Sequence, residues 1–351
     1  MLLLHEGQFP TDRALDIERT EFSPGVRRML GVVGSECSSF RLAAEQLLLL
    51  AGLEVTAKAV ERVAEAIGAD ISARQQAEIQ KALQLELPAA VGPPIPVLYV
   101  ELDGTGVPVV AKETEGRQGR EEGKPPRTRE AKMGCVFTQT TVDEEGYPVR
   151  DPTSTTYLGG IQTSAEFGRA LYTEAYRRGW SRAVHRVFLA DGQHYNWNVA
   201  QEYFPGAVQI VDLYHAREHV WGLGAKLYPC DKAAKVAWIK THQHWLDDGQ
   251  IENLVTSLRS IGFQKPELGD PIRTEANYFE ANAERMRYPQ FRSRGFFVGT
   301  GVMEAACKTI IGGRLKRSGM FWTVRGADSI IALRCCRLSG NFEDYWERRR
   351  A

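Results

Sequence analysis

The sequence predicts a mixed α/β fold, in which a sheet core is interrupted by an all-helical insertion and preceded by a small helical domain. Between residues 96 and 221, short apolar runs that end in an acidic residue alternate with helical segments, as expected for strands joined by crossovers. Residues 222–297 have apolar residues at near-helical spacing and little strand character. The predicted divisions are residues 1–95, 96–221, 222–297 and 298–351.

The composition is that of an ordinary globular protein. The 351 residues carry a net charge of zero, so the chain as a whole is not attracted to nucleic acid or to acidic membranes, and local patches must provide any such binding. The six cysteines form no CxxC motif. The first residues lack the features of a secretion signal, and no apolar run is long enough to span a bilayer. We therefore expect a cytoplasmic protein with reduced thiols.

The N-terminal division has helical patterns only. The predicted helices span residues 38–50, 57–67 and 73–85. Thr56 is a suitable N-cap for the second helix, and Gly52 ends the first. This pair is compatible with a helix-turn-helix that reads DNA, although a simple packing hairpin gives the same pattern. A proline-rich stretch over residues 88–96 then marks the boundary with the core.

The core division contains five apolar runs with strand character. The predicted strands span residues 97–102, 134–142, 154–158, 184–190 and 207–211. Helices are predicted over residues 164–179 and 196–203. Three strands followed by alternating helices and strands is the ribonuclease H-like order. The first and fourth strands lie side by side in that order, so Asp103 and Asp191, which follow them, are expected to face each other.

Three acidic residues are candidates for a divalent metal site. Asp103 and Asp191 end adjacent strands, where ligands of open α/β sheets bind. Glu304 lies on a predicted helix over residues 302–312, facing inward and sharing a face with Lys308. Mg²⁺ prefers a few carboxylates together with water and phosphate oxygens. For either aspartate alone, a cap of a strand-helix turn explains the pattern as well.

Asp212 and His215 follow the last strand, and we interpret them as accessory residues of the same site. A different chemistry overlaps them, because His215, Glu218 and His219 form an H-x-x-E-H motif. Two histidines four residues apart on a helix can bind zinc, with the glutamate as general base. A zinc metallopeptidase is therefore an alternative, although it leaves Asp103 and Asp191 unexplained.

The chain resembles the ISKra-type family of bacterial insertion-sequence transposases, within a Mutator-like and hAT-like group that has a ribonuclease H core. The stretches that carry the resemblance are GQFPTDRALDIE, SPGVRRM, SFRLAAEQLLLLAGLEV, YVELDGTGVPV, TREAKMGCVF, FLADGQHYNWNVAQEYFPGAVQIVDLYHAREHVW and GTGVMEAACKTIIGGRLKRSGMFWTVRGADSIIALR. The resemblance implies a DDE triad at Asp103, Asp191 and Glu304. It places the group's Asp-x-x-His motif on Asp212 and His215.

The resemblance also implies partners and a reaction. The reaction is cleavage at transposon ends and strand transfer to target DNA, with Mg²⁺ or Mn²⁺ as cofactor and a homodimer or higher oligomer as the active form. The expected DNA contacts are Lys308, Arg314, Lys316, Arg129 and Trp221. Family members usually carry paired cysteines before the GQFP segment, and none is present here. A truncated, inactive DNA-binding relic is therefore a further alternative.

Overall fold

The computed structural model describes residues 16, 20–119 and 126–349. Five strands form the main sheet: β1 (Ile95–Pro108), β2 (Thr128–Gln139), β5 (Thr156–Gly160), β6 (Ala183–Ala190) and β7 (Val208–Val211). A separate hairpin consists of β3 (Thr141–Val142) and β4 (Pro148–Val149). The α-helices are α2 (Pro24–Glu36), α3 (Phe40–Ala51), α4 (Ala57–Leu83), α5 (Ser164–Arg177), α6 (His194–Tyr203), α7 (Leu213–Leu227), α8 (Lys232–Asp247), α9 (Ile251–Gln264), α10 (Gly269–Ala281), α11 (Tyr288–Ser293), α12 (Gly301–Ala306), α13 (Gly313–Leu315), α14 (Val324–Leu338) and α15 (Phe342–Glu347).

The sheet is mixed, and β1 lies at its centre. The strand order is β5-β2-β1-β6-β7. β1 pairs antiparallel with β2 and parallel with β6, while β6 pairs parallel with β7 and β2 pairs antiparallel with β5. The predictions of a mixed α/β fold and of adjacent first and fourth strands are therefore confirmed. The finer ribonuclease H-like assignment stays a prediction.

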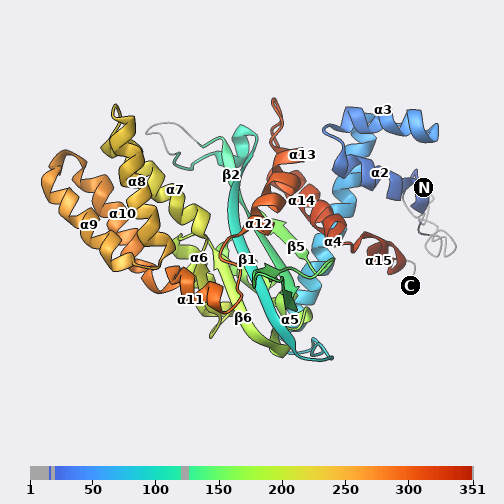
Figure 1. The fold of residues 1–351 in the computed structure, drawn as a ribbon. Coiled ribbons are helices and arrows are strands. Elements are labelled where there is room, and N and C mark those ends of the chain that lie inside the picture. The colour runs from blue at the N-terminus through green and yellow to red at the C-terminus, as the bar shows by residue number, and fades with distance from the viewer. Residues whose placement is uncertain (1–15, 17–19, 120–125, 350–351) are drawn as a thin grey trace, which may run out of the picture.

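Helices cover both faces of the sheet (Figure 1). On one face Gly134 of β2 lies against Leu171 of α5, where a Cβ on the glycine would be 2.8 Å from the leucine side chain. On the other face Gly159 of β5 lies against Met133 and against Ile331 of α14. The small residues at these points let the helices lie close to the strands. Both faces of β1 and β2 are consequently buried.

Helix α4 is a single helix of 27 residues, where the sequence predicted two helices over residues 57–67 and 73–85. Thr56 caps it as predicted, because its Oγ1 accepts from Ala59 N (3.1 Å). The predicted interruption between residues 67 and 73 was wrong, because Gly68 lies within the continuous helix and packs against α14. A Cβ at Gly68 would lie 2.9 Å from the backbone Cα of Ser329 in α14, so the glycine is the point where the two helices touch.

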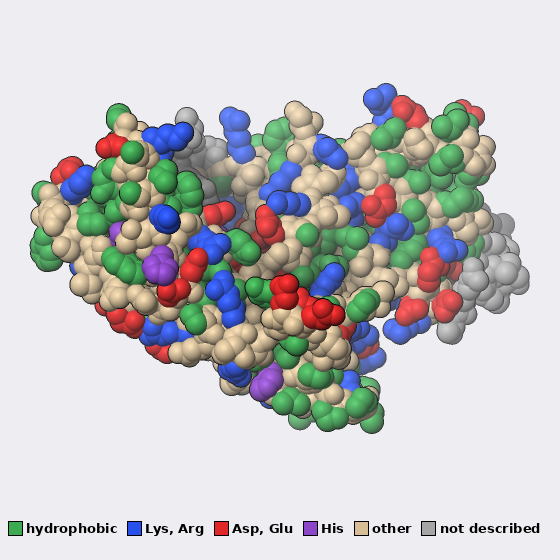
Figure 2. Space-filling model, in the orientation of Figure 1, with side chains coloured by type: hydrophobic (Ala, Val, Ile, Leu, Met, Phe, Trp, Pro, Cys, Tyr) green, Lys and Arg blue, Asp and Glu red, His purple; other side chains and the backbone are tan. Residues whose placement is uncertain are grey.

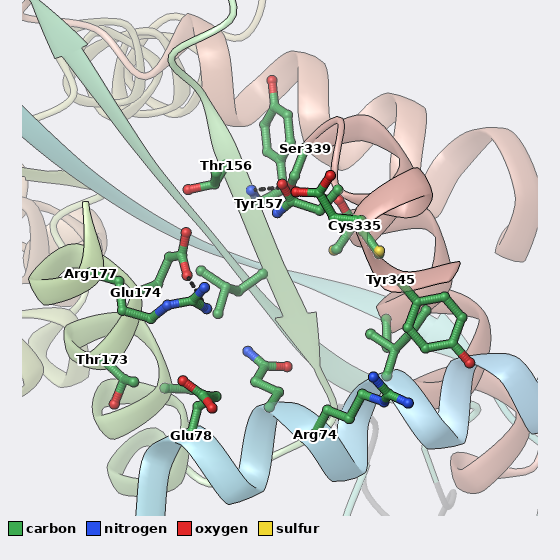
Figure 3. A pocket seen from close by; sticks show the side chains of 18 of the residues that line it. Arg74, Glu78, Thr156, Tyr157, Thr173, Glu174, Arg177, Cys335, Ser339 and Tyr345 are labelled. Carbon is green, nitrogen blue, oxygen red and sulfur yellow. Dashed lines mark hydrogen bonds and ion pairs between the residues drawn. The ribbon is translucent and has the colours of Figure 1, made fainter. Parts of the chain in front are cut away.

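The outer edge of the sheet is partly closed by side chains that follow or lie on α14. Tyr157 N donates to Ser339 Oγ (2.8 Å), and Ile161 N donates to Asp328 Oδ1 (2.6 Å). Covering these donors keeps the edge strand from pairing with other chains. A cavity of about 480 Å³ remains between β5 and the surrounding helices, with the Glu174–Arg177 ion pair in its wall (Figure 3).

Helices α7 to α10 form a helical unit at the β7 end of the sheet (Figure 1). The chain enters this unit and leaves it at one place. Thr300 N donates to Asp212 Oδ2 (2.6 Å) across 88 residues of sequence, and Leu213 N donates to Val298 O (2.9 Å). We call these two pairs the neck. No helix among the described residues combines the length and the apolar character needed to cross a bilayer.

Candidate functional site

Two carboxylates lie where the parallel pairing of β1 with β6 ends. Leu102 of β1 is in register with Ala190 of β6, so Asp103 and Asp191 come next on adjacent strands. Asp103 is still paired with Met133 of β2, whereas Asp191 begins the turn into α6. The apolar runs are long enough to fix both strands. The Asp-Gly pair after β6 ends that strand, whereas β1 continues through Asp103-Gly104 to Pro108 in pairing with β2, so the predicted end of the first strand at residue 102 was wrong. The structure therefore brings these two predicted residues together.

The environment of Asp191 is unfavourable for its charge. Burial raises the pKa of Asp191 above its ordinary value, and the neighbouring Asp103 raises it further. The backbone N–H of Gln193, the His215 ring and the Asn196 side chain oppose this rise. Gln193 N donates to Asp191 Oδ1 at 3.0 Å. Two oxygen ligands that repel each other in this way are stabilised when a cation lies between them.

Glu304 reaches this region on helix α12. The thiol of Cys307, one turn further along the chain, donates to Asp103 Oδ2 (3.4 Å). The Glu304 side chain is 65% exposed and forms an ion pair with Lys308. The prediction that Glu304 faces inward was wrong. Met303 and Ala306 occupy the buried face of α12, and adjacent helical residues point about 100° apart.

The helix changes its geometry directly after Glu304. Residues Cys307–Gly312 form a π-helical segment between α12 and α13. Such segments are rare and are frequently found at functional sites, because the extra residue per turn redirects the side chains. Here the segment begins at the residue that contacts Asp103. It therefore determines how the helix passes the ends of β1 and β6.

Asp212 acts as a connector. Its Oδ1 accepts from Tyr214 N (2.6 Å) and His215 N (3.0 Å), which caps α7, and its Oδ2 accepts from the backbone and hydroxyl of Thr300. Its oxygens are fully used within the protein. His215 lies close enough to Asp191 to affect the pKa of that carboxyl, so of the two predicted accessory residues only His215 faces the acids.

The H-x-x-E-H motif has other partners. His219 Nδ1 lies 2.7 Å from Glu275 Oε2 of α10, and its ring stacks on Tyr278 with centroids 3.9 Å apart. Glu218 is exposed and pairs with His215 Nδ1 at 3.5 Å. Within the described residues, no three or more His, Cys, Asp or Glu side chains are grouped so as to hold a metal ion. The motif therefore joins α7 to α10, and no structural observation favours the zinc peptidase.

Arg314 was expected to contact DNA, and this prediction was wrong. The side chain is completely buried, with Nε donating to Gly34 O (3.2 Å) at the end of α2. Its guanidinium lies 4.3 Å from the ring centroid of Phe40 and 5.1 Å from that of Trp322. Burial lowers the pKa of Arg314 to about 10. Arg314 thus joins the N-terminal helices to the core and cannot reach a phosphate.

The other predicted DNA contacts lie at or near the surface. Lys316 Nζ donates to Thr105 Oγ1 (2.5 Å), two residues beyond Asp103. Arg129 Nη1 donates to Glu113 O (3.2 Å), and Trp221 is 51% exposed on α7. Figure 2 shows basic side chains interspersed with acidic ones across this face, not a continuous basic surface. Any attraction for DNA is therefore local, as the zero net charge predicted.

Two polar residues next to the aspartates were not predicted. The hydroxyl of Tyr195 is buried and has no hydrogen-bond partner among the described residues, and its charge neighbours are Glu130, Asp191 and Asp103. Lys132 pairs with Glu130 (2.6 Å), and its ammonium lies 4.8 Å from the centre of the Tyr195 ring. The position of Tyr195 in the first turn after Asp191 could have indicated that it lies near the aspartates.

Glu101 was also missed. It is completely buried on β1, where its Oε2 accepts from Met303 N (3.0 Å) and from the Cys135 thiol (3.5 Å). Burial raises the pKa of Glu101 to about 8. The alternation of the sequence could have indicated Glu101. Every second position of this apolar strand is polar, at Tyr99, Glu101 and Asp103, which places these side chains on one face.

The fold and the site define a mixed α/β protein with two neighbouring carboxylates at the point where the parallel pairing of β1 and β6 ends. No protein-family model matches the chain. The chain is similar to the "UPF0236 protein in vanSb 3'region" of Streptococcus gallolyticus, with 25% identity over 354 residues that cover 96% of this chain and 68% of that protein. It is similar to a chain of the Drosophila P element transposase strand transfer complex at a TM-score of 0.29, with 9% identity over 95% of this chain and 82% of that one. A TM-score of this size does not establish that the two chains share a fold.

Proposed function

We propose that this chain is an insertion-sequence transposase of the ISKra type, which cuts and joins DNA strands by metal-dependent phosphoryl transfer. The observation that supports this most is the meeting of Asp103 and Asp191 at the point where the parallel pairing of β1 and β6 ends. The helix that bears Glu304 is held against the same place through Cys307. A reaction of this class needs acidic side chains from separate elements at one point, next to room for a phosphodiester.

Two of the residues present, Asp103 and Asp191, fit a divalent cation, although no group of three potential ligands is assembled among the described residues. Asp103 and Asp191 offer carboxylate oxygens, which Mg²⁺ and Mn²⁺ prefer, and the burial of Asp191 beside a second carboxylate is a charge arrangement that a cation relieves. Glu304 completes the ligand set when its side chain leaves Lys308. A bound cation would supply Lewis-acid activation of the phosphodiester and neutralisation of its developing charge.

The remaining residues of the site bind and orient the DNA. Lys308, once released from Glu304, and Lys316 would neutralise phosphates of the bound DNA, which positions DNA without reading its sequence. His215 lies beside Asp191 and can donate to a phosphate oxygen. Trp221 is exposed on the helical unit and offers a stacking surface for a base. Two DNA ends must be joined in transposition, so we expect the active form to be a dimer or higher oligomer.

The test is strand cleavage of a duplex that carries the terminal repeats of the flanking element, with Mg²⁺ or Mn²⁺. Asp103→Asn, Asp191→Asn and Glu304→Gln are each expected to reduce cleavage by roughly a hundredfold or more, since loss of even a supporting residue of a metal site costs 10–100-fold. The matched control is Asp248→Asn, at an exposed aspartate of the helical unit that pairs with His244, and it should cleave like the parent.

The outcomes separate the proposals. Cleavage that requires the metal and all three acids would support the transposase. Cleavage that persists in Asp191→Asn would refute it. A folded protein that binds DNA but does not cleave with any metal would favour the inactive relic.

A further inference from the structure

One face of β1 carries a row of polar side chains that all contact the same returning segment of chain. Tyr99, Glu101 and Asp103 occupy alternate positions and therefore point to the same face of the sheet. Along the segment that returns from the helical unit, Tyr99 Oη accepts from Phe297 N (3.2 Å), Glu101 Oε2 from Met303 N, and Asp103 Oδ2 from the Cys307 thiol. The strand and the segment are thus joined at three successive points.

Glu101 is the middle point and the most deeply buried. Its side chain is completely inaccessible, and no charged side chain pairs with it among the described residues. Burying an ionisable group costs free energy unless its polar atoms are used. Of its two oxygens, Oε2 is used by Met303 N and the Cys135 thiol, while Oε1 has no partner in the described part of the chain. The burial of Glu101 is therefore not explained by a gain in stability.

The donor that Glu101 satisfies belongs to the first turn of α12. Met303 is the third residue of that helix, and the first four backbone N–H groups of a helix have no partner within it. The adjacent N-cap residue, Thr300, donates its N–H to Asp212 instead. The start of α12 is therefore held from two strands at once, by Asp212 after β7 and by Glu101 in β1.

We propose that Glu101 is a positioning residue, which fixes α12 and hence Glu304 in register with Asp103 by accepting the hydrogen bond of Met303 N–H. The inference rests on the proposed function for the role of Glu304. Glu101 forms no hydrogen bond with any of the three acids of the triad among the described residues, so its role is indirect. An apolar residue of the same volume would leave Met303 N–H buried without a partner, and α12 could then slide along β1.

Hydrogen exchange measured by mass spectrometry tests the contact without any assay of activity. Glu101→Met keeps the volume and removes the acceptor, whereas Glu101→Gln keeps an acceptor oxygen. In the methionine variant, exchange in peptides covering residues 300–307 should accelerate roughly tenfold, the effect of losing one buried hydrogen bond, while peptides covering β6 stay unchanged. The glutamine variant should match the parent within about twofold.

Tyr99→Phe is the matched control, because it removes the neighbouring contact of the same row. It should accelerate exchange around Phe297 and leave residues 300–307 protected. The inference is overturned if Glu101→Met leaves residues 300–307 as protected as in the parent, if the glutamine and methionine variants behave alike, or if exchange rises equally throughout the sheet.

A second readout separates this inference from the proposed function. Mn²⁺ affinity, measured by electron paramagnetic resonance, should fall in Glu101→Met and be restored in Glu101→Gln, and cleavage by the methionine variant should show a lower kcat at unchanged KM for DNA. If the parent protein and Asp191→Asn bind Mn²⁺ equally, the proposed metal site is refuted. The exchange data then still decide whether Glu101 fixes α12.

Discussion

Replacing Asp212 should destabilise the protein more than the loss of a helix cap, because this residue joins two distant parts of the chain. Its carboxylate accepts from Tyr214 N, His215 N and both donors of Thr300, and it is only 5% exposed. A lost N-cap costs about 1 kcal/mol, and a hydrogen bond to a charged group contributes about 1.5–3 kcal/mol. Asp212→Ala should therefore lower the free energy of unfolding by about 2.5–4 kcal/mol.

Asp231 provides the comparison, because it caps α8 alone. Its Oδ1 accepts from Ala234 N (2.9 Å), and the residue is exposed. Asp231→Ala should cost about 1 kcal/mol, and Asp212→Asn, which keeps the cap of α7 but loses the acceptor for Thr300, should fall between the two. Urea denaturation measures all three. If Asp212→Ala costs no more than Asp231→Ala, the reasoning about the neck is refuted.

Three further predictions follow from the packing and charges described above. Gly68→Ala should lower the free energy of unfolding by about 2 kcal/mol or more despite the better helix propensity of alanine, because the new Cβ meets the backbone of α14. Gly222→Ala, where no heavy atom lies within 4 Å of the new Cβ, should raise the free energy of unfolding by up to about 1 kcal/mol in the same denaturation experiment. Equal effects of the two substitutions would contradict the packing argument. Burial raises the pKa of Asp328, so its folded form binds more protons than its unfolded form, and stability falls as pH rises from the unfolded pKa of about 3.9 through the raised folded pKa. Asp328→Asn should abolish that fall while keeping the acceptor for Ile161 N, and an unchanged pH profile would contradict this. Lys316→Ala should weaken DNA binding evenly across sequences and reduce the slope of log affinity against log salt by about 1, which fluorescence anisotropy at several salt concentrations measures; an unchanged slope would exclude a phosphate contact.

The end of β6 at Ala190 could be predicted from the sequence because local chemistry decides it, whereas β1 runs past the predicted residue 102 to Pro108 because it stays paired with β2. The apolar run before Asp103 and the one before Asp191 are each followed by an Asp-Gly pair, and parallel pairing then places both acids at one edge. The class of fold followed from the same alternation. These features depend on a few adjacent residues, and the structure confirms them.

Features that depend on distant partners could not be predicted in this way. Arg314 lies in a short basic stretch that looks like a surface, but its acceptor Gly34 and its aromatic neighbour Phe40 are about 280 residues away in sequence. The single helix α4 was predicted as two helices, and the contact of Gly68 with Ser329 that packs its middle is equally remote in sequence. Glu304 looked inward because helical spacing gives the faces of α12 but not which face meets the sheet.

The neck brings the two ends of the helical unit together at one place in the architecture. Because the chain leaves and re-enters the core at adjacent points, the connection between these points behaves like a loop whose two ends are fixed. The entropy of closing such a loop rises only by about 0.6 kcal/mol for each doubling of its length. Insertions or deletions in the connections of α8 and α9 therefore change little in the core, whereas α7 carries His215 and α10 packs Tyr278 against Gly192 beside Asp191, so these two helices stay tied to the form of the acidic site.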